Sequence, residues 1–200
     1  MIEVAAVVLA AGRSSRFHAA GGAEVTKLVA TLDGKPVVRH VVEAALASRA
    51  RPVIVVVGHA KGAVESALGR LPATIVFNPN YATGLASSLR AGLSAVPTYV
   101  GGALMLLGDM PRVEAALIDA LIDAFESRPN AQAVAPVHGG RRGNPVILSR
   151  TLFDRARLLD GDEGARRLLA TLPGSDIIEI AAAGPGVAFD VDTPSDLPAD

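Results

Sequence analysis

Long runs of apolar residues are the feature of this sequence that most constrains its fold. Residues 4–10, 53–57 and 103–107 contain only Val, Ile, Leu, Ala and Met. Because these runs do not alternate between apolar and polar residues, each is predicted to be a strand buried on both faces. Such strands are typical of a parallel sheet that is covered by helices on both sides.

Segments with helical periodicity separate these runs. Apolar residues recur at helical spacing in residues 37–46 and 117–125. The remaining expected elements are helices at 61–71, 85–96, 151–159 and 163–172, and strands at 74–77, 133–136, 145–148, 177–180 and 187–191. This alternation predicts an α/β fold with three layers, in which a mostly parallel sheet has helices on both faces. We expect a single domain over residues 1–200, with the later elements forming a lid or a pocket for a second substrate.

Composition argues against several classes of function. The 19 Lys and Arg residues are balanced by 20 Asp and Glu, for a formal net charge of -1, so nothing favours a nucleic-acid partner. The absence of cysteine removes disulfides, zinc fingers, thiolate nucleophiles and iron–sulfur clusters. No stretch reaches the roughly 18 to 20 apolar residues of a membrane span, and residues 1–11 lack the basic start of a signal peptide. We therefore expect a cytoplasmic protein with no membrane partner.

The loop after the first predicted strand carries cations and small residues. It reads Ala11-Gly12-Arg13-Ser14-Ser15-Arg16, and Lys27 follows after a gap. Ligands of open parallel sheets bind beyond the carboxyl ends of the strands, so the backbone N–H groups and cations of this loop suit a polyphosphate. Neither a Walker motif nor GxGxxG occurs in this turn, and a loop whose cations face only water remains the alternative.

Carboxylates occur at two further strand ends. Asp109 follows the strand at 103–107 and suits Mg²⁺, which needs only one or two protein carboxylates when phosphates complete its shell. The alternative is that Asp109 caps a helix. Asp190 and Asp192 would face the same side of a strand, where two carboxylates repel unless a cation lies between them. The alternative here is that Asp192 or Thr193 caps a helix that Pro194 opens.

Other candidate motifs are weaker. The loop from Asn78 to Ser88 supplies amides, hydroxyls and a helix N-terminus that suit a base, ribose or phosphate, although ordinary turn chemistry also accounts for it. The four histidines have no metal-ligand spacing. The sequence has no GxSxG motif, so nothing supports a serine hydrolase.

Taken together, the segments resemble the molybdenum cofactor cytidylyltransferases, which belong to the nucleotidyltransferase superfamily. The segments that carry the resemblance occur in the family's order over nearly the whole chain: Leu9-Ala10-Ala11-Gly12-Arg13-Ser14-Ser15-Arg16-Phe17 with Lys27, Asn78-Pro79 with Gly84-Leu85-Ala86-Ser87-Ser88-Leu89, Leu106-Leu107-Gly108-Asp109-Met110-Pro111, Gly140-Arg141-Arg142-Gly143-Asn144-Pro145-Val146, Gly161-Asp162-Glu163-Gly164-Ala165-Arg166, and Asp190-Val191-Asp192-Thr193-Pro194-Ser195-Asp196-Leu197. Each segment is a weak signal alone, whereas the ordered set is fairly specific.

The resemblance implies a fold, a reaction and roles for particular residues. It implies a Rossmann-like nucleotidyltransferase domain with a nucleotide-binding part at 1–111 and an acceptor-binding, closing part at 112–200. The implied reaction joins CMP from Mg²⁺-CTP to the terminal phosphate of molybdopterin and releases pyrophosphate. The implied catalytic residues are Arg16, Lys27 and Asp109, and the metal would lie on Asp109 with Asp190 or Asp192. The acceptor would face Asn144, Asp162 and Arg166. The nucleotide would contact Leu9, Ala10, Ala11, Gly12, Arg13, Ser14, Asn78, Gly84, Ser87 and Ser88.

This chain departs from the family's pattern in two places. Lys27 lies further beyond Arg16 than is usual, which predicts a longer, mobile loop that brings Lys27 to the phosphates only on closure. Asn144 stands where many relatives have histidine. The alternatives are a GTP-using guanylyltransferase, a cytidylyltransferase for a sugar or alcohol phosphate, and a non-catalytic module that delivers the cofactor. A molybdenum hydroxylase or dehydrogenase that receives the cofactor is an expectation from the family alone.

Overall fold

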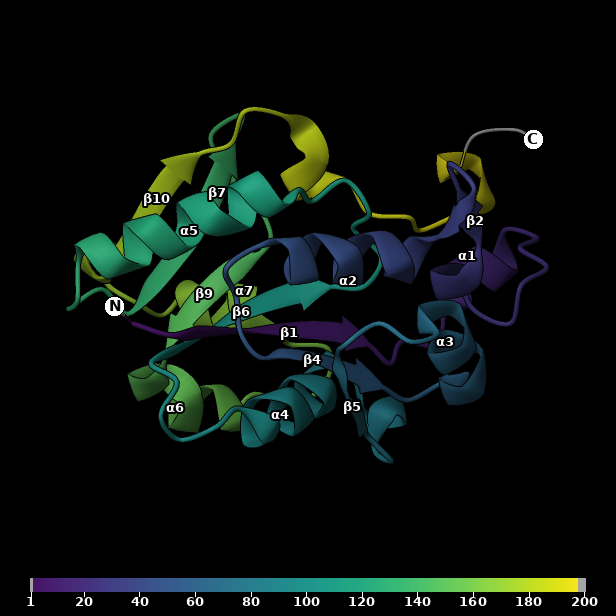
Figure 1. The fold of residues 1–200 in the computed structure, drawn as a ribbon, viewed down its shortest axis with the longest axis horizontal. Helices are drawn as coiled ribbons and strands as arrows, with labels where there is room; N and C mark the ends of the chain where they lie inside the picture. Colours follow the sequence, from purple (N-terminus) through teal and green to yellow (C-terminus); the bar gives the residue numbers. More distant parts are fainter. Residues whose placement is uncertain (1, 198–200) are drawn as a thin grey trace.

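The centre of the molecule is a twisted eight-stranded sheet, shown in Figure 1. The computed structural model describes residues 2–197. The strands lie in the order β10-β7-β9-β6-β1-β4-β5, and β8 pairs with β7. Their bounds are β1 Val4–Ala10, β4 Val53–Val57, β5 Thr74–Phe77, β6 Gly102–Leu107, β7 Ala133–His138, β8 Arg141–Arg142, β9 Val146–Ser149 and β10 Ile177–Ala181.

The apolar runs form the middle of this sheet. β1 lies between β4 and β6 and is parallel to both, and all of its residues are buried, as its unbroken apolar run predicts. β4 is also parallel to β5. The direction changes at β9, which is antiparallel to β6 and to β7, while β10 runs parallel to β7. Strands from both halves of the chain therefore share one sheet.

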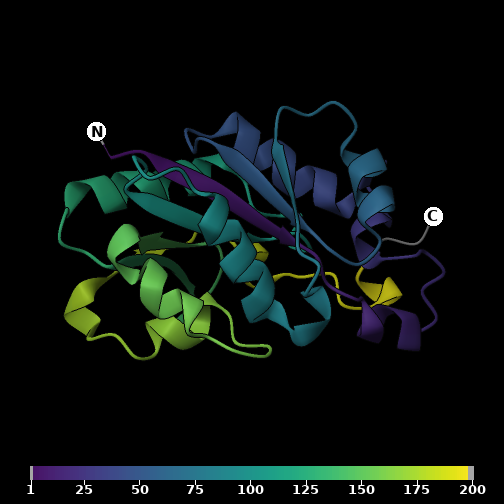
Figure 2. The same cartoon turned by 90° about the horizontal axis from the view of Figure 1, so that it is seen from below.

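Helices cover both faces, as Figure 2 shows from below. On one face α2 (Val37–Ala47), α3 (Lys61–Leu68) and α5 (Ala115–Ser127) share a core with inward side chains of β1, β4 and β6. On the other face α4 (Leu85–Ala95), α6 (Phe153–Arg157) and α7 (Ala165–Leu169) share a second core with the alternate residues of the same strands. The predicted three-layer α/β fold is confirmed.

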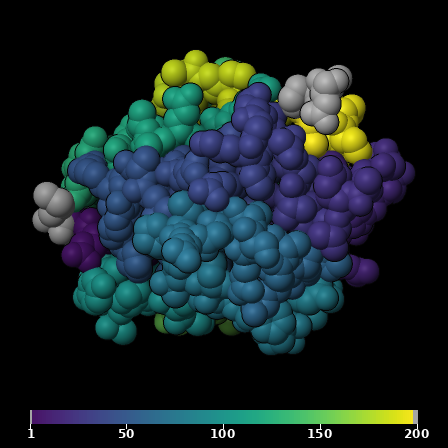
Figure 3. All heavy atoms as spheres, turned by 45° about the vertical axis from the view of Figure 1, so that its right-hand side comes forward, coloured from purple at the N-terminus to yellow at the C-terminus, as the bar shows by residue number. Residues whose placement is uncertain are grey.

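Short elements connect this framework, most of them at the carboxyl ends of the parallel strands, while η3 and η4 lie at the opposite ends. They are α1 (Ser15–Ala19), the β2–β3 hairpin (Thr31–Leu32 and Lys35–Pro36), and the 3-10 helices η1 (Lys27–Val29), η2 (Tyr81–Thr83), η3 (Arg150–Leu152), η4 (Gly174–Asp176), η5 (Pro185–Ala188) and η6 (Pro194–Asp196). A small cluster that contains Phe17, Leu32 and Val191 joins the N-terminal loop to the C-terminal segment. Figure 3 shows these two segments side by side, in purple and yellow.

Several expected boundaries are wrong, and one expected strand does not form. Residues 187–191 are the end of η5 followed by irregular chain. Pro185-Gly186 favours a tight turn, and the segment makes only isolated backbone hydrogen bonds to loops at the ends of the strands. The helices predicted at 151–159 and 163–172 are shorter and are preceded or followed by turns, and the helix predicted at 61–71 ends at Leu68, before Gly69. Within residues 2–197, no helix has the length and apolar character that crossing a membrane requires.

Candidate active site

A cavity of about 540 Å³ opens beyond the carboxyl ends of β1 and β6. Backbone and side chains of the β1–α1 loop form one wall, and the segment that leads into α4 forms the other. The lining residues are Leu9, Ala11, Gly12, Arg13, Ser14, Ser15, Arg16, Phe17, Lys27, Leu28, Tyr81, Ala82, Gly84, Leu85, Ser88, Leu107, Asp109, Asp162 and Asp192. The volume falls within the range of small-molecule sites in proteins.

The β1–α1 loop folds back on the segment that carries Lys27. The Ser14 hydroxyl lies 2.9 Å from that of Thr26 and accepts a hydrogen bond of 3.1 Å from the Lys27 backbone N–H. Ser14 itself has a left-handed backbone with φ of 55°, which opens the turn into α1. These bonds hold Lys27 at the cavity wall, and the contact of Lys27 with phosphates on closure of the loop stays a prediction.

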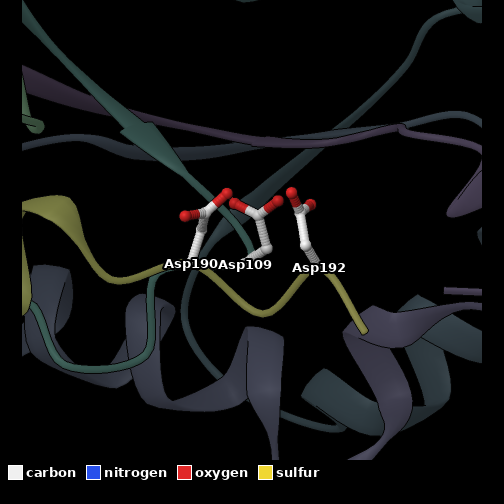
Figure 4. A group of neighbouring side chains, drawn as sticks. All are labelled: Asp109, Asp190 and Asp192. Atoms are coloured by element: carbon white, nitrogen blue, oxygen red, sulfur yellow. The ribbon is translucent and has the colours of Figure 1, made fainter. Parts of the chain in front are cut away.

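The carboxylates of Asp109, Asp190 and Asp192 converge, as Figure 4 shows. Asp109 leaves the end of β6, and Asp190 and Asp192 come from the segment between η5 and η6. One oxygen from each lies within 4.8 Å of the others. The Val191 N–H donates to the Asp109 carbonyl at 2.9 Å, which holds the C-terminal segment against the end of β6. The predicted convergence therefore occurs without the predicted strand.

Two cations neutralise much of the charge of this cluster. Lys27 Nζ lies 2.7 Å from Asp109 Oδ2 and 2.9 Å from Asp192 Oδ1, and Arg16 forms an ion pair with Asp192. Burial tends to lower the pKa of Lys27, but the ion pairs with Asp109 and Asp192 outweigh it and raise the pKa above its usual value. Burial, together with the charges of Asp192 and Asp109, raises the pKa of Asp190. Like charges at this spacing favour the binding of a further cation.

The donor set fits a hard divalent cation. Carboxylate oxygens are the ligands that Mg²⁺ and Mn²⁺ prefer, and three of them converge here. The capping alternative is wrong for Asp109, because α5 begins only at Ala115, and it is confirmed for Thr193, which forms a capping box with Asp196 at the start of η6. Asp109 and Asp192 are therefore not used as helix caps.

Of the polar side chains of Asn78, Ser87 and Ser88, which are predicted to bind the nucleotide, only Ser88 lines the cavity. Asn78 is buried, and its Nδ2 donates to Ser87 Oγ at 2.8 Å and to Ser88 Oγ at 3.1 Å. Ser87 Oγ lies within hydrogen-bond distance of the Asn80 and Gly84 carbonyls, so Asn78 and Ser87 shape the turn and do not line the cavity. Ser88 does line it, and because its oxygen accepts from Asn78, its hydroxyl proton is available to another acceptor.

The residues predicted to contact the acceptor are also divided. Asp162 lies at the cavity, whereas Asn144 and Arg166 are not among its lining residues. The backbone N–H of Asn144 donates to the Val187 carbonyl at 2.9 Å, which ties this turn to the segment that leads to Asp190. Ala10 packs in the core behind the cavity.

Sequence reasoning assigned no role to two aromatic residues of the wall, Phe17 and Tyr81. Tyr81 lies in η2 with its ring centroid 6.0 Å from that of His59. A Cβ at Gly58 would be 2.5 Å from the Tyr81 Cβ, so this glycine is what lets Tyr81 pack against the end of β4. The sequence signal that could have identified such a residue is an aromatic side chain a few positions after the end of a predicted strand.

Comparison with known proteins identifies the family. Residues 6–177 match the MobA-like NTP transferase domain. The chain belongs to this family. It is therefore a nucleotidyltransferase of the MobA-like type, and a nucleotide is the class of substrate that the family implies. The residues that line the cavity lie within the matched range, apart from Asp192.

Similar proteins of known sequence and structure agree with this assignment. The chain is 28% identical over 168 residues to the bifunctional protein GlmU of Clavibacter sepedonicus, in a match that covers 82% of this chain but only 31% of that protein. The crystal structure of Rv0371c from Mycobacterium tuberculosis has a TM-score of 0.82 and 28% identity, with 98% of this chain and 95% of that chain covered. A nucleotidyl transferase from Methanothermobacter thermautotroptrophicus has a TM-score of 0.83 and 28% identity, with 97% and 94% covered. The chain spans about a third of the length of the curated GlmU relatives.

Proposed function

We propose that the protein transfers CMP from CTP to the terminal phosphate of molybdopterin, with a divalent cation, and releases pyrophosphate. The observation that carries the transfer reaction is the pairing of Lys27 with Asp109 and Asp192 in a nucleotide-sized cavity of a MobA-like fold, with the Asp190 carboxylate converging on the same two aspartates. The choice of CTP and molybdopterin rests on the ordered motifs of the sequence.

The carboxylate cluster is the proposed metal site. Asp109 would hold Mg²⁺ or Mn²⁺ with Asp190 and Asp192, whose oxygens already converge. A bound cation would neutralise charge on the triphosphate and on the departing pyrophosphate. In support, the structure of the neighbour Rv0371c, 27% identical with a TM-score of 0.80, was solved as a complex with manganese.

The cations of the cavity wall would bind the phosphates. Lys27 and Arg16 pair with the carboxylates in this structure, and in the loaded site their charge is available to the α-phosphate and the pyrophosphate. Arg13 and the backbone N–H groups of residues 12–14 lie on the same wall and would hold the rest of the triphosphate. Stabilising this charge in the transition state is what such a transfer needs from the protein.

The walls on either side of the phosphates would bind the nucleoside and the acceptor. Leu9, Ala11, Gly12, Gly84 and Ser88 line the proposed nucleotide side, with Ser88 able to donate its hydroxyl proton to a base or sugar oxygen. Asp162 would face the acceptor. Asn144 and Arg166 lie outside the cavity wall, so we propose that they contact the acceptor beyond the rim.

The reaction itself requires little from a general base. An oxygen of the acceptor phosphate, already ionised at neutral pH, forms a bond to the α-phosphorus of CTP. The bond from that phosphorus to the oxygen bridging the β-phosphate breaks, and its electron pair leaves with pyrophosphate. The protein's part is to align the two substrates and to stabilise charge, which agrees with a cavity wall that, among residues 2–197, contains no histidine.

Formation of molybdopterin cytosine dinucleotide from CTP and molybdopterin tests this proposal. We expect product with CTP, and a loss of most of the rate in Asp109→Asn with the fold unchanged by circular dichroism. Product with GTP alone would assign the guanylyl reaction, and product only with a sugar or alcohol phosphate would replace the acceptor. Delivery of intact cofactor by Asp109→Asn, without transfer by the wild type, would indicate a carrier module.

A further inference from the structure

The loop that brings Asp162 to the cavity is held by helix α4. The side chain of Arg90, on α4, donates to the Leu159 carbonyl at 2.5 Å. Leu159 itself is buried in the same core as Leu89 and Leu93 of α4. Four residues further toward the N-terminus of α4, the Ala86 N–H donates to the Gly161 carbonyl at 3.0 Å. Two bonds from one helix therefore fix residues 159–161.

The approach of the loop to the start of α4 is so close that only glycine fits there. Gly84 has φ of +109°, and a Cβ on it would lie 2.2 Å from the Gly161 carbonyl oxygen. A Cβ on Gly164 would lie 2.8 Å from Leu85 Cδ2. By contrast, a Cβ on Gly161 meets nothing within 4 Å. The missing side chain at position 84, and not the one at position 161, therefore leaves the space for this close contact.

This arrangement separates two groups of residues at the cavity. Hydrogen bonds among Ser14, Thr26 and Lys27 hold the wall that carries the proposed phosphate-binding cations, and none of these bonds involves Arg90 or Leu159. Asp162 borders the cavity, is exposed, and directly follows Gly161, whose carbonyl accepts the hydrogen bond from the Ala86 N–H. As a carboxylate, Asp162 can accept hydrogen bonds from N–H or O–H groups of a ligand.

We propose that Arg90 is a positioning residue for the acceptor: it holds the Leu159–Gly161 turn so that Asp162 meets N–H or O–H donors on the body of a phosphate-bearing acceptor. The inference rests on the proposed transfer function for the role of Asp162. The latch itself, Arg90 on the Leu159 carbonyl and Ala86 on the Gly161 carbonyl, stands on the geometry alone.

Three variants test the latch. Arg90→Met removes the donor and keeps the apolar stem, and Arg90→Lys keeps a cation that can donate one bond. Arg150→Met is the matched control, because Arg150 also donates to backbone carbonyls, of Val100 at 2.5 Å and of Pro97, away from the cavity. For each variant we would measure the KM for molybdopterin, kcat, the Kd for Mn²⁺-CTP, and the hydrogen exchange of the Ala86 amide by NMR.

We expect Arg90→Met to raise the acceptor KM about tenfold, equivalent to ~1.4 kcal/mol, with the Kd for Mn²⁺-CTP unchanged. The Ala86 amide should exchange at least about tenfold faster, because it loses the Gly161 carbonyl when the turn is released. Arg90→Lys should recover part of both effects, and Arg150→Met should show neither. A general loss of folding would instead weaken the binding of both substrates together.

An unchanged Ala86 exchange in Arg90→Met would overturn the latch. Equal weakening of nucleotide and acceptor binding would overturn its assignment to the acceptor. If the wild-type protein forms no product with molybdopterin, the proposed acceptor is wrong, and the Ala86 exchange still decides whether Arg90 holds the turn. The two failures are therefore distinguishable.

Discussion

Replacing Lys27 by Met should destabilise the protein in the absence of a divalent cation. The Lys27 side chain is only 14% exposed, and its partners Asp109 and Asp192 are 21% and 28% exposed. Removing one partner of a fully buried ion pair costs about 3–5 kcal/mol, whereas an exposed pair contributes about 0–1 kcal/mol. The partly buried position of Lys27 lies between these limits, so we expect a loss of about 2 kcal/mol.

The assay is thermal unfolding in EDTA. For a chain of this length, 1 kcal/mol shifts Tm by roughly 2–4 °C, so Lys27→Met should melt about 4–8 °C lower. Lys35→Met is the matched control, since Lys35 pairs with Glu43 at 2.8 Å but is 51% exposed, and its Tm should change by less than about 2 °C.

Manganese supplies the decisive comparison. A cation among the carboxylates replaces the charge that Lys27→Met removes, so Mn²⁺ should raise the Tm of the variant more than that of the wild type.

The stabilising effect of Lys27 should also depend on pH. Because the pKa of Lys27 is raised, this effect is present below the ordinary lysine pKa and is lost as the pH rises through the raised value. Equal melting temperatures of Lys27→Met and wild type in EDTA at neutral pH would refute this account of the cluster.

Three further predictions concern neighbouring residues. Asp190→Asn should raise the metal-free Tm slightly, because burial and two nearby carboxylates raise the pKa of Asp190 and penalise its charged form above that pKa. The same variant should bind Mn²⁺ more weakly, as measured by EPR. A lower metal-free Tm would contradict this prediction. Gly84→Ala should cost about 3 kcal/mol in urea unfolding, because its φ of +109° and the Gly161 carbonyl both exclude a Cβ, while Gly161→Ala should cost about 1 kcal/mol. Asp196→Ala should cost about 1 kcal/mol at pH 7, because Asp196 accepts the N–H groups of Thr193 and Asp192, which lower its pKa. This difference should be present above the ordinary aspartate pKa and vanish as the pH falls through the lowered value; a difference that does not depend on pH would contradict the capping role.

The sheet was predictable because burial on both faces leaves a direct mark on the sequence. The residues of β1 and β4 are apolar without exception, and their short length and valine content favour a buried strand over a helix. The C-terminal segment was not predictable by the same means. Val187 and Val191 are buried, but they anchor an irregular segment against the sheet edge, and their spacing resembles that of a strand.

The residues of the candidate site were likewise predictable only in part. Asp109 could be named because a carboxylate that directly follows a buried strand lies at the edge of the sheet where ligands bind. Asp190 and Asp192 were named from their spacing on an expected strand that does not form, yet their carboxylates still converge with that of Asp109. Asn78 and Ser87 have the same residue types as a nucleotide site, yet they bond to each other and to the turn. The Arg90 latch could not be predicted, because it joins positions 69 residues apart through a backbone carbonyl, which has no sequence signature.

The most direct test of the central claim is a comparison of Tm for the wild-type protein and Asp109→Asn with Mn²⁺ and each of CTP, GTP, ATP and UTP. A nucleotide at about 100 times its Kd should add about 2.7 kcal/mol, or roughly 5–10 °C. We predict this shift with CTP for the wild type, and a much smaller shift for Asp109→Asn. No shift with any nucleotide, or an equal shift in both proteins, would contradict a metal-nucleotide site on Asp109.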